Sequence, residues 1–311
     1  MRIKGLKGPD GSIPLAALQE VLKALLGSSE RALRLVVEGT SVKSGSVPKW
    51  LKASLEYSIT GISKGSTVLE IEAPTLGETA PSLIRQQDLW LPPPRPDDTA
   101  FTVLSKSVSD ASAKRLDSER FDSGVLDALL DFRPLFQRYA TEVTLSSRGR
   151  PKEHFSISEQ SLEDISQLRL RTPEPQAVTI AGEFDLIEHS QGKFKLILED
   201  GPILHGMVDQ THLSVELMRN YWGKKVTVKG MAQYRPSGAI RLLEAQVIKP
   251  FEAGEEVFEA SPQTQISLAF DRPAGRQNKD RSFLQDIWGK WPGDETIDDL
   301  LAALKGSEST N

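Results

Sequence analysis

The stretch QAVTIAGEFDLIEHSQGKFKLILEDGPILHGMVD, residues 176–209, alternates apolar and polar side chains and is interrupted by two short turn motifs, SQG and GP. A period of two is typical of half-buried strands, so this stretch predicts three of them. Farther along, THLSVELMRNYW predicts a short helix, and GKKVTVKGMAQY and AIRLLEAQVIKP predict two more strands around an RPSG turn. Residues 173–250 therefore predict five strands, with one helix between the third and the fourth.

Four glycines in this segment favour a closed barrel, and the first of them, Gly182, follows the apolar run of the first predicted strand. Gly206 and Gly230 fall inside predicted strands, at places where a barrel bends sharply and a side chain would crowd its neighbours. Gly223 follows the predicted helix, where glycine commonly ends a helix. With these glycines, the order of elements resembles an OB-fold, a small closed Greek-key barrel. The resemblance implies a fold and leaves the function open, because such folds carry many functions.

Residues 1–172 predict an α+β domain that precedes the barrel. A proline-rich stretch at 91–98 predicts a linker or stiff turn within it. The helix that starts at Pro14 either breaks at Gly27 or continues past it. In chain order we expect a strand at 2–7, a helix from Pro14, a hairpin of strands 53–62 and 67–74, helices around 101–108 and 125–136, a second hairpin of strands 142–147 and 154–158, and a helix at 159–168.

The composition excludes several classes of protein. The chain has 311 residues, a net charge of −5 and no cysteine, which excludes disulfides, thiol nucleophiles and cysteine-ligated zinc. Its N-terminus lacks the apolar core of a signal peptide. No run of residues approaches the ~20 apolar positions that a membrane-spanning helix needs. We therefore expect a soluble, cytoplasmic protein with no membrane contact.

The sequence offers no convincing catalytic or metal-binding constellation. His205, Asp209 and His212 lie close together in the sequence, but their spacing does not force three side chains onto one ion. There is no Walker sequence, no G-x-G-x-x-G motif and no G-x-S-x-G elbow. We therefore predict a non-enzymatic protein with no catalytic residues, no metal site and no cofactor.

Single-stranded nucleic acid is one candidate ligand of the predicted barrel. From Ala177 to Lys249 the chain has nine Lys or Arg residues against eight Asp or Glu residues, so the barrel is close to neutral. Neutrality weakens nucleic-acid binding, which depends on neutralising phosphates. A barrel that serves only as a spacer or docking surface is the alternative. The best candidates for a nucleic-acid groove are Lys193, Lys195, Lys229, Tyr234 and Arg235.

The end of the chain predicts a polar linker at 251–281 and a helical tail at 282–311. In this tail, apolar side chains recur at helical spacing and form one stripe. So short a helix needs a ready-made groove in order to fold, either on this protein or on a partner. The predicted partner-binding residues are Phe283, Leu284, Ile287, Trp288, Lys290, Trp291, Ile297, Leu300, Leu301 and Leu304.

The tail also carries a family resemblance. Its sequence W-G-K-W-P-G-D-E-x-x-x-D-L-L-A-A-L, residues 288–304, resembles the C-terminal segment of bacterial proteins encoded beside PIN-domain ribonuclease toxins. The stretches KGLKGPDGSIPLAAL, GISKGSTVLEIEAPTLGETAP and NYWGKKVTVKG resemble the same proteins. The resemblance implies an antitoxin-like protein whose C-terminal peptide covers the acidic, metal-binding active site of the toxin.

In that family the inhibitory peptide normally offers a basic residue to the acidic site. This chain departs from the pattern, because residues 282–305 contain five acids and only two lysines. Lys290, with Arg281 just before the tail, is the candidate cation. The expected partner is therefore a PIN-domain ribonuclease, and nucleic acid is the second candidate.

Overall fold

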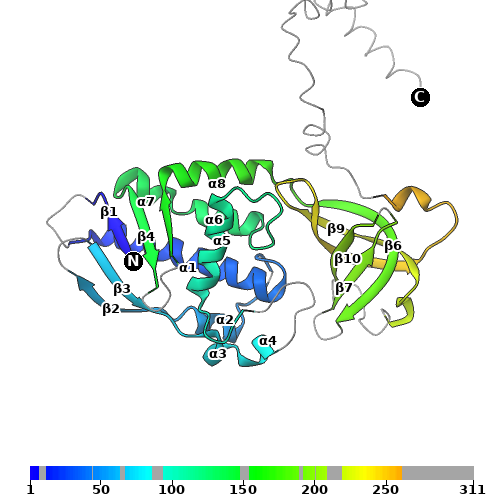
Figure 1. Cartoon of the computed structure of the whole chain (residues 1–311), viewed down its shortest axis with the longest axis horizontal. Coiled ribbons are helices and arrows are strands. Elements are labelled where there is room, and N and C mark those ends of the chain that lie inside the picture. The colour runs from blue at the N-terminus through cyan, green and yellow to red at the C-terminus, as the bar shows by residue number, and fades with distance from the viewer. Residues whose placement is uncertain are drawn as a thin grey trace, which may run out of the picture. The chain divides into compact units, whose positions relative to one another are not determined.

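The computed structural model describes residues 1–6, 12–43, 45–63, 67–85, 94–147, 154–188, 192–199, 201–208 and 219–260. These residues all belong to one compact unit, Met1–Leu268. They form a five-stranded sheet with helices, followed by a closed five-stranded barrel (Figure 1).

The strand at the centre of the sheet comes from the start of the chain. The strand order is β2-β3-β1-β4-β5, and every pair is antiparallel. Arg2 pairs with Val68 on one side and with Thr144 on the other. Both predicted hairpins are therefore confirmed, and β1 joins them into one sheet. The strands are β1 (Arg2–Lys4), β2 (Ser58–Ser63), β3 (Thr67–Glu72), β4 (Glu142–Ser146) and β5 (His154–Ser158).

Eight α-helices accompany this sheet in the described part of the chain. Buried apolar side chains of the longer helices and of the strands merge into one hydrophobic core. Within it, the rings of Phe101 and Phe155 stack with their centroids 5.7 Å apart. The helices are α1 (Leu15–Glu38), α2 (Lys49–Ser54), α3 (Leu76–Thr79), α4 (Pro81–Arg85), α5 (Ala100–Ser112), α6 (Ser123–Leu130), α7 (Arg133–Arg138) and α8 (Glu159–Arg171).

The structure decides one open alternative and changes two expectations at the level of these elements. Of the two alternatives for the helix that starts at Pro14, the continuous one is confirmed, because α1 runs through Gly27 without a break. The predicted strand at 53–62 is wrong in its first part, because Ala53 and Ser54 end α2, which starts directly after Pro48. The helical pattern at 125–136 is divided into α6 and α7. Pro134 explains the division, since proline lacks an N–H and its ring clashes with the carbonyl of the preceding turn.

The barrel is closed in the order β10-β8-β7-β6-β9. Strands β8 and β10 pair in parallel and the other four pairs are antiparallel. The predicted five-stranded barrel is confirmed, and it is consistent with an OB-like fold. The predicted helix lies outside the described residues except for a 3-10 turn at Arg219–Tyr221. The strands are β6 (Gln176–Glu188), β7 (Lys193–Ile197), β8 (Ile203–Val208), β9 (Lys225–Tyr234) and β10 (Ile240–Pro250).

The barrel has its own hydrophobic core, separate from that of the sheet and helices. Two of the predicted bend glycines lie where a side chain would collide. A Cβ on Gly206 would lie 2.1 Å from Cζ of Phe194, whose ring stacks on Phe184 in the core. A Cβ on Gly230 would lie 2.0 Å from the carbonyl oxygen of Glu244, beside a bulge in β10. These two positions therefore require glycine.

Residues 251–260, predicted as the start of a linker, are held against the barrel instead. Phe251 donates its N–H to the carbonyl of Lys225 at 3.2 Å, and a 3-10 turn follows at Glu256–Phe258. The rest of the predicted linker and the whole tail lie outside the described residues, and the domain boundaries near 172 and 250 stay predictions. None of the described helices has both the length and the apolar character needed to span a bilayer.

Candidate functional site

The predicted partner-binding residues, Phe283 to Leu304, all lie outside the described part of the chain. Their role therefore stays a prediction. The five barrel residues proposed to bind nucleic acid are described, so the structure can be compared with that prediction.

Those five side chains do not form one open groove. Lys193 is 1% exposed, and Tyr234 is 3% exposed and belongs to the barrel core. Burial raises the pKa of the Tyr234 hydroxyl. Arg235 is mostly covered, whereas Lys195 on β7 is half-buried and Lys229 on β9 is exposed. Only Lys195 and Lys229 of this set therefore offer substantial surface to a ligand.

Several cations of the barrel, including Arg235, are paired with acids of the same chain. Arg235 forms an ion pair with Glu119 and donates to the carbonyl of Ile240 at 2.9 Å. Lys225 pairs with Glu259 and lies 3.9 Å from Glu199. These pairs reduce the positive charge that the barrel could present to phosphates.

Glu255 is the centre of the contacts that hold residues 251–260. Its carboxylate pairs with Lys249 at 2.6 Å and accepts hydrogen bonds from the Thr227 hydroxyl at 2.6 Å and the Glu252 N–H at 3.1 Å. The bond from Lys249, then the bond from Thr227, lower the pKa of Glu255 to about 2. We call Glu255, Lys249, Thr227 and Glu252 the Glu255 cluster. It holds residues 251–260 against the barrel.

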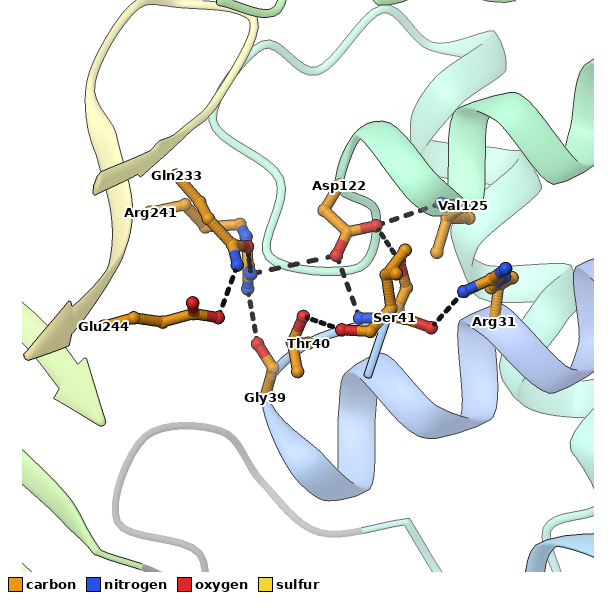
Figure 2. A network of polar contacts seen from close by, with 10 residues as sticks. Arg31, Gly39, Thr40, Ser41, Asp122, Val125, Gln233, Arg241 and Glu244 are labelled. Carbon is orange, nitrogen blue, oxygen red and sulfur yellow. Dashed lines mark hydrogen bonds and ion pairs between the residues drawn. The ribbon is translucent and has the colours of Figure 1, made fainter. Parts of the chain in front are cut away.

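A second polar network connects β10 to the segment that follows α1, as Figure 2 shows. The Arg241 guanidinium donates to the Gly39 carbonyl at 2.9 Å and to the Gln233 side chain at 2.7 Å. It also lies 3.8 Å from the Asp122 carboxylate. Gln233 in turn donates to Glu244 at 2.8 Å. A buried arginine is thus surrounded by acceptors from distant parts of the sequence.

Asp122 organises the other half of the network. It accepts hydrogen bonds from the Ser41 hydroxyl at 2.6 Å and the Ser41 N–H at 3.0 Å. It also accepts from the Val125 N–H at 3.0 Å, so it caps the N-terminus of α6. Gly39 has a φ of 82°, which lets it end α1 in the left-handed conformation and turn its carbonyl toward Arg241.

The network is structural in character. Burial lowers the pKa of Arg241, while the charge of Asp122 opposes that shift. The carboxylate of Asp122 already accepts from the Val125 N–H and the Ser41 hydroxyl and lies beside the Arg241 guanidinium. Its role is therefore to hold these elements together. Neither Arg241 nor Asp122 was predicted from the sequence to have this role. Asp122 could have been predicted as an N-cap, because it directly precedes the helical pattern SGVLDALL. Arg241 lies in a predicted strand, where no local signal indicates that it is buried.

A cavity of about 680 Å³ lies next to the residues that follow α5. Asp110 faces it and accepts from Arg115 at 2.9 Å and from the Ser118 hydroxyl at 2.8 Å. Asp98 lies at the same cavity and pairs with Lys106 at 3.2 Å. The carboxylates of Asp110 and Asp98 therefore already have partners within the chain. Their contacts stabilise the turn that carries Glu119.

The histidine-containing cluster weighed in the sequence is described only in part. His205 lies on β8 opposite Lys195 of β7, whereas Asp209 and His212 fall outside the described residues. Within the described ranges, no three His, Asp or Glu side chains are grouped so that they could hold a metal ion.

Comparison with protein-family models, curated proteins and solved structures found no match for this chain.

Proposed function

We propose that this chain is a non-enzymatic, antitoxin-like protein that binds a PIN-domain ribonuclease through residues 282–311. The sequence support is the apolar stripe of that segment and its resemblance to proteins encoded beside such toxins. In this proposal the sheet, helices and barrel form the body that carries the binding segment.

One structural observation favours a protein partner over nucleic acid. Five of the nine barrel cations are buried or paired with acids of the same chain: Lys193, Lys225, Arg235, Arg241 and Lys249. Binding to phosphates gains most of its free energy from cations that release counterions. A barrel whose cations are already engaged gains little in this way.

The Glu255 cluster adds a geometric argument. Because residues 251–260 are held against the barrel, only residues 261–281 of the predicted linker can separate the tail from the barrel. Residues 261–281, fully extended, span at most ~70 Å. A partner held by the tail would therefore stay within that distance of the barrel.

The tail would dock as an amphipathic helix with aromatic anchors. Trp288 and Trp291 are of the residue type most enriched at binding hot spots. Lys290 lies between them and is the cation that would face the acidic metal site of the ribonuclease. Trp288→Ala should therefore weaken binding strongly, by ~2 kcal/mol or more.

The proposal predicts that a PIN-domain ribonuclease is encoded beside this gene, and the test uses that ribonuclease in recombinant form. Its affinity and its cleavage of RNA are measured with the full chain, with residues 1–260 and with Trp288→Ala. The matched control is Trp222→Ala, which removes a tryptophan that is 70% exposed on the barrel. We expect the full chain and the control to bind and inhibit, and the other two to fail. Inhibition by residues 1–260 would overturn the proposal.

Nucleic-acid binding stays the second candidate because of one surface feature. Trp222 and Lys224 are exposed and are separated in the sequence only by Gly223, and Lys229 is exposed on β9. An exposed aromatic beside cations is the arrangement that stacks bases of single strands. We expect weak, salt-sensitive binding of a single-stranded oligonucleotide. Submicromolar binding at physiological salt that is lost in Trp222→Ala and Lys229→Gln would make this the leading function.

A further inference from the structure

The edge of the five-stranded sheet that β2 forms carries no charge. In the described part of the chain, β2 has a strand neighbour on one side only, which is β3 (Figure 1). Residues 57–63, YSITGIS, contain no charged side chain and no proline, the groups that usually keep an edge strand from pairing with other chains. Because the backbone groups of a strand point alternately to its two sides, half of those in β2 point away from β3 and can pair with another strand.

Two exposed isoleucines lie on the side of β2 that faces the core. Ile59 pairs with Ile71 of β3, and Ile62 pairs with Leu69. Directly paired residues of neighbouring strands point to the same face of a sheet, and Leu69 is fully buried in the core of the sheet and helices. Ile59 and Ile62 are nevertheless 44% and 54% exposed. The core side of β2 therefore presents two large apolar side chains to solvent.

A bulge in β2 places both isoleucines on this face. In a regular strand, residues three positions apart point to opposite faces. Between Ile59 and Gly61, however, β2 advances by two residues while β3 advances by only one, from Ile71 to Glu70. Thr60 is the extra residue of a β-bulge, and it shifts the alternation by one position. Ile59 and Ile62 therefore share one face although they are three residues apart.

The same bulge limits which strand can pair with this edge. A regular strand cannot follow an edge that contains an extra residue, which is why bulges usually protect edges. A strand with an extra residue at the matching position can follow it. Residues 58–63, S-I-T-G-I-S, read the same in both directions except for the central T-G. A second copy of β2, placed antiparallel to the first, therefore meets the requirement.

Such a pair is symmetric about a two-fold axis between Thr60 and Gly61. Ile59 then lies opposite Ile62 of the second copy, and Ile62 lies opposite Ile59 of the second copy, as in any isologous interface. Both pairs are on the core side of the sheet, since the bulge is present in both strands. Cross-strand pairs of β-branched residues stabilise a sheet, and no like charges meet within residues 57–63.

We propose that β2 binds β2 of a second copy of this chain, so that the two five-stranded sheets join into one continuous sheet. The matching bulge, the symmetric sequence and the exposed isoleucines select a second copy as the partner. Only one short strand from each chain takes part, so the interface is small and the dimer dissociates reversibly. The inference does not depend on the C-terminal tail, so it goes beyond the proposed function.

Sedimentation velocity of the full chain, from micromolar to millimolar concentration, tests the association. We expect the mass to shift from one chain to two as the concentration rises. Ile62→Lys should weaken dimerisation at least ~tenfold, because lysine on an edge strand opposes pairing. The matched control is Leu170→Lys, at a leucine of α8 that is 72% exposed, and it should dimerise like the parent. A chain that stays monomeric throughout, or an Ile62→Lys variant that dimerises like the parent, would overturn the proposal.

Disulfide trapping tests the register and does not depend on charge. The chain has no cysteine, so Ile59→Cys and Ile62→Cys each introduce a single thiol. Directly opposite residues have Cβ atoms ~4.5–5.5 Å apart, close to disulfide distance, whereas equal positions in the two copies are ~10 Å apart along the strands. Under mild oxidation we expect linked dimers in a mixture of the two variants and few in either alone. Equal linking in all three samples, or none in the mixture, would refute the pairing.

Discussion

Gly206 and Gly27 both lie inside regular elements, but the space around them differs. At Gly206 a Cβ would overlap the buried ring of Phe194, and at Gly27 nothing lies within 4 Å of an added Cβ. Gly206→Ala should therefore lower the free energy of unfolding by ~1–3 kcal/mol through overpacking. Gly27→Ala should raise it by ~1 kcal/mol, because alanine favours the helix. Urea denaturation of the two variants measures both signs, and a stabilising Gly206→Ala would contradict the barrel geometry.

Arg241 and Asp122 permit a direct measurement of the network in Figure 2. Removing one partner of a buried ion pair costs ~3–5 kcal/mol, so Arg241→Met should be strongly destabilising. Asp122→Asn should also destabilise, because it weakens the cap of α6 as well. The double variant should lose less than the sum of the two, since the same interaction is removed once. The control, Arg133→Met, changes an exposed arginine of α7 and should alter stability by less than ~0.5 kcal/mol.

At the scale of elements, the Glu255 cluster makes the attachment of residues 251–260 dependent on pH. The pKa of Glu255 in the folded protein is about 2, below the ordinary value of 4.5 for a glutamate carboxyl. A depressed carboxylate pKa stabilises the fold fully above 4.5, and this contribution disappears as the pH falls toward 2. Glu255→Gln should therefore lower the thermal midpoint at pH 7 and have a much smaller effect near pH 2.

The comparison must be made between the variant and the parent chain at each pH, because the pKa of Glu142 is also lowered to about 2, chiefly by its bond from Ser156. The control is Glu56→Gln, which changes an exposed glutamate outside the Glu255 cluster and away from the contacts of Glu142. A difference between parent and Glu255→Gln that stays constant from pH 7 to pH 2 would show that the Glu255 charge does not hold the segment.

The elements that could be predicted are those whose signals are local. Both hairpins and the barrel strands follow from alternation and turn residues within short windows. The central place of β1 did not follow, because it depends on contacts between Arg2 and Thr144 that no local pattern encodes. The same limit applies to the exposure of side chains on the barrel. Alternation along β7 predicts that Lys193 is exposed, because the next residue, Phe194, points into the core. Lys193 is nevertheless buried.

At the scale of the whole molecule, the tail should be separable from the fold. The described residues up to 260 contain two hydrophobic cores, one in the sheet and helices and one in the barrel. Deleting residues 282–311 should therefore leave the thermal midpoint nearly unchanged while abolishing capture of the ribonuclease. A midpoint lowered by many degrees would mean that the apolar stripe packs on its own protein, and the antitoxin proposal would lose its main support.

The central position of β1 has a consequence for synthesis. β1 leaves the ribosome first, and its partner on one side, β3, follows soon after, whereas its partner on the other side, β4, begins only at Glu142. At ~5–20 residues per second, translation reaches β4 on the order of ten seconds after β1. Through that interval the nascent sheet has an open edge, which is the kind of edge that pairs with other chains. A ribosome paused before residue 142 therefore displays a half-built sheet for a chaperone to shield.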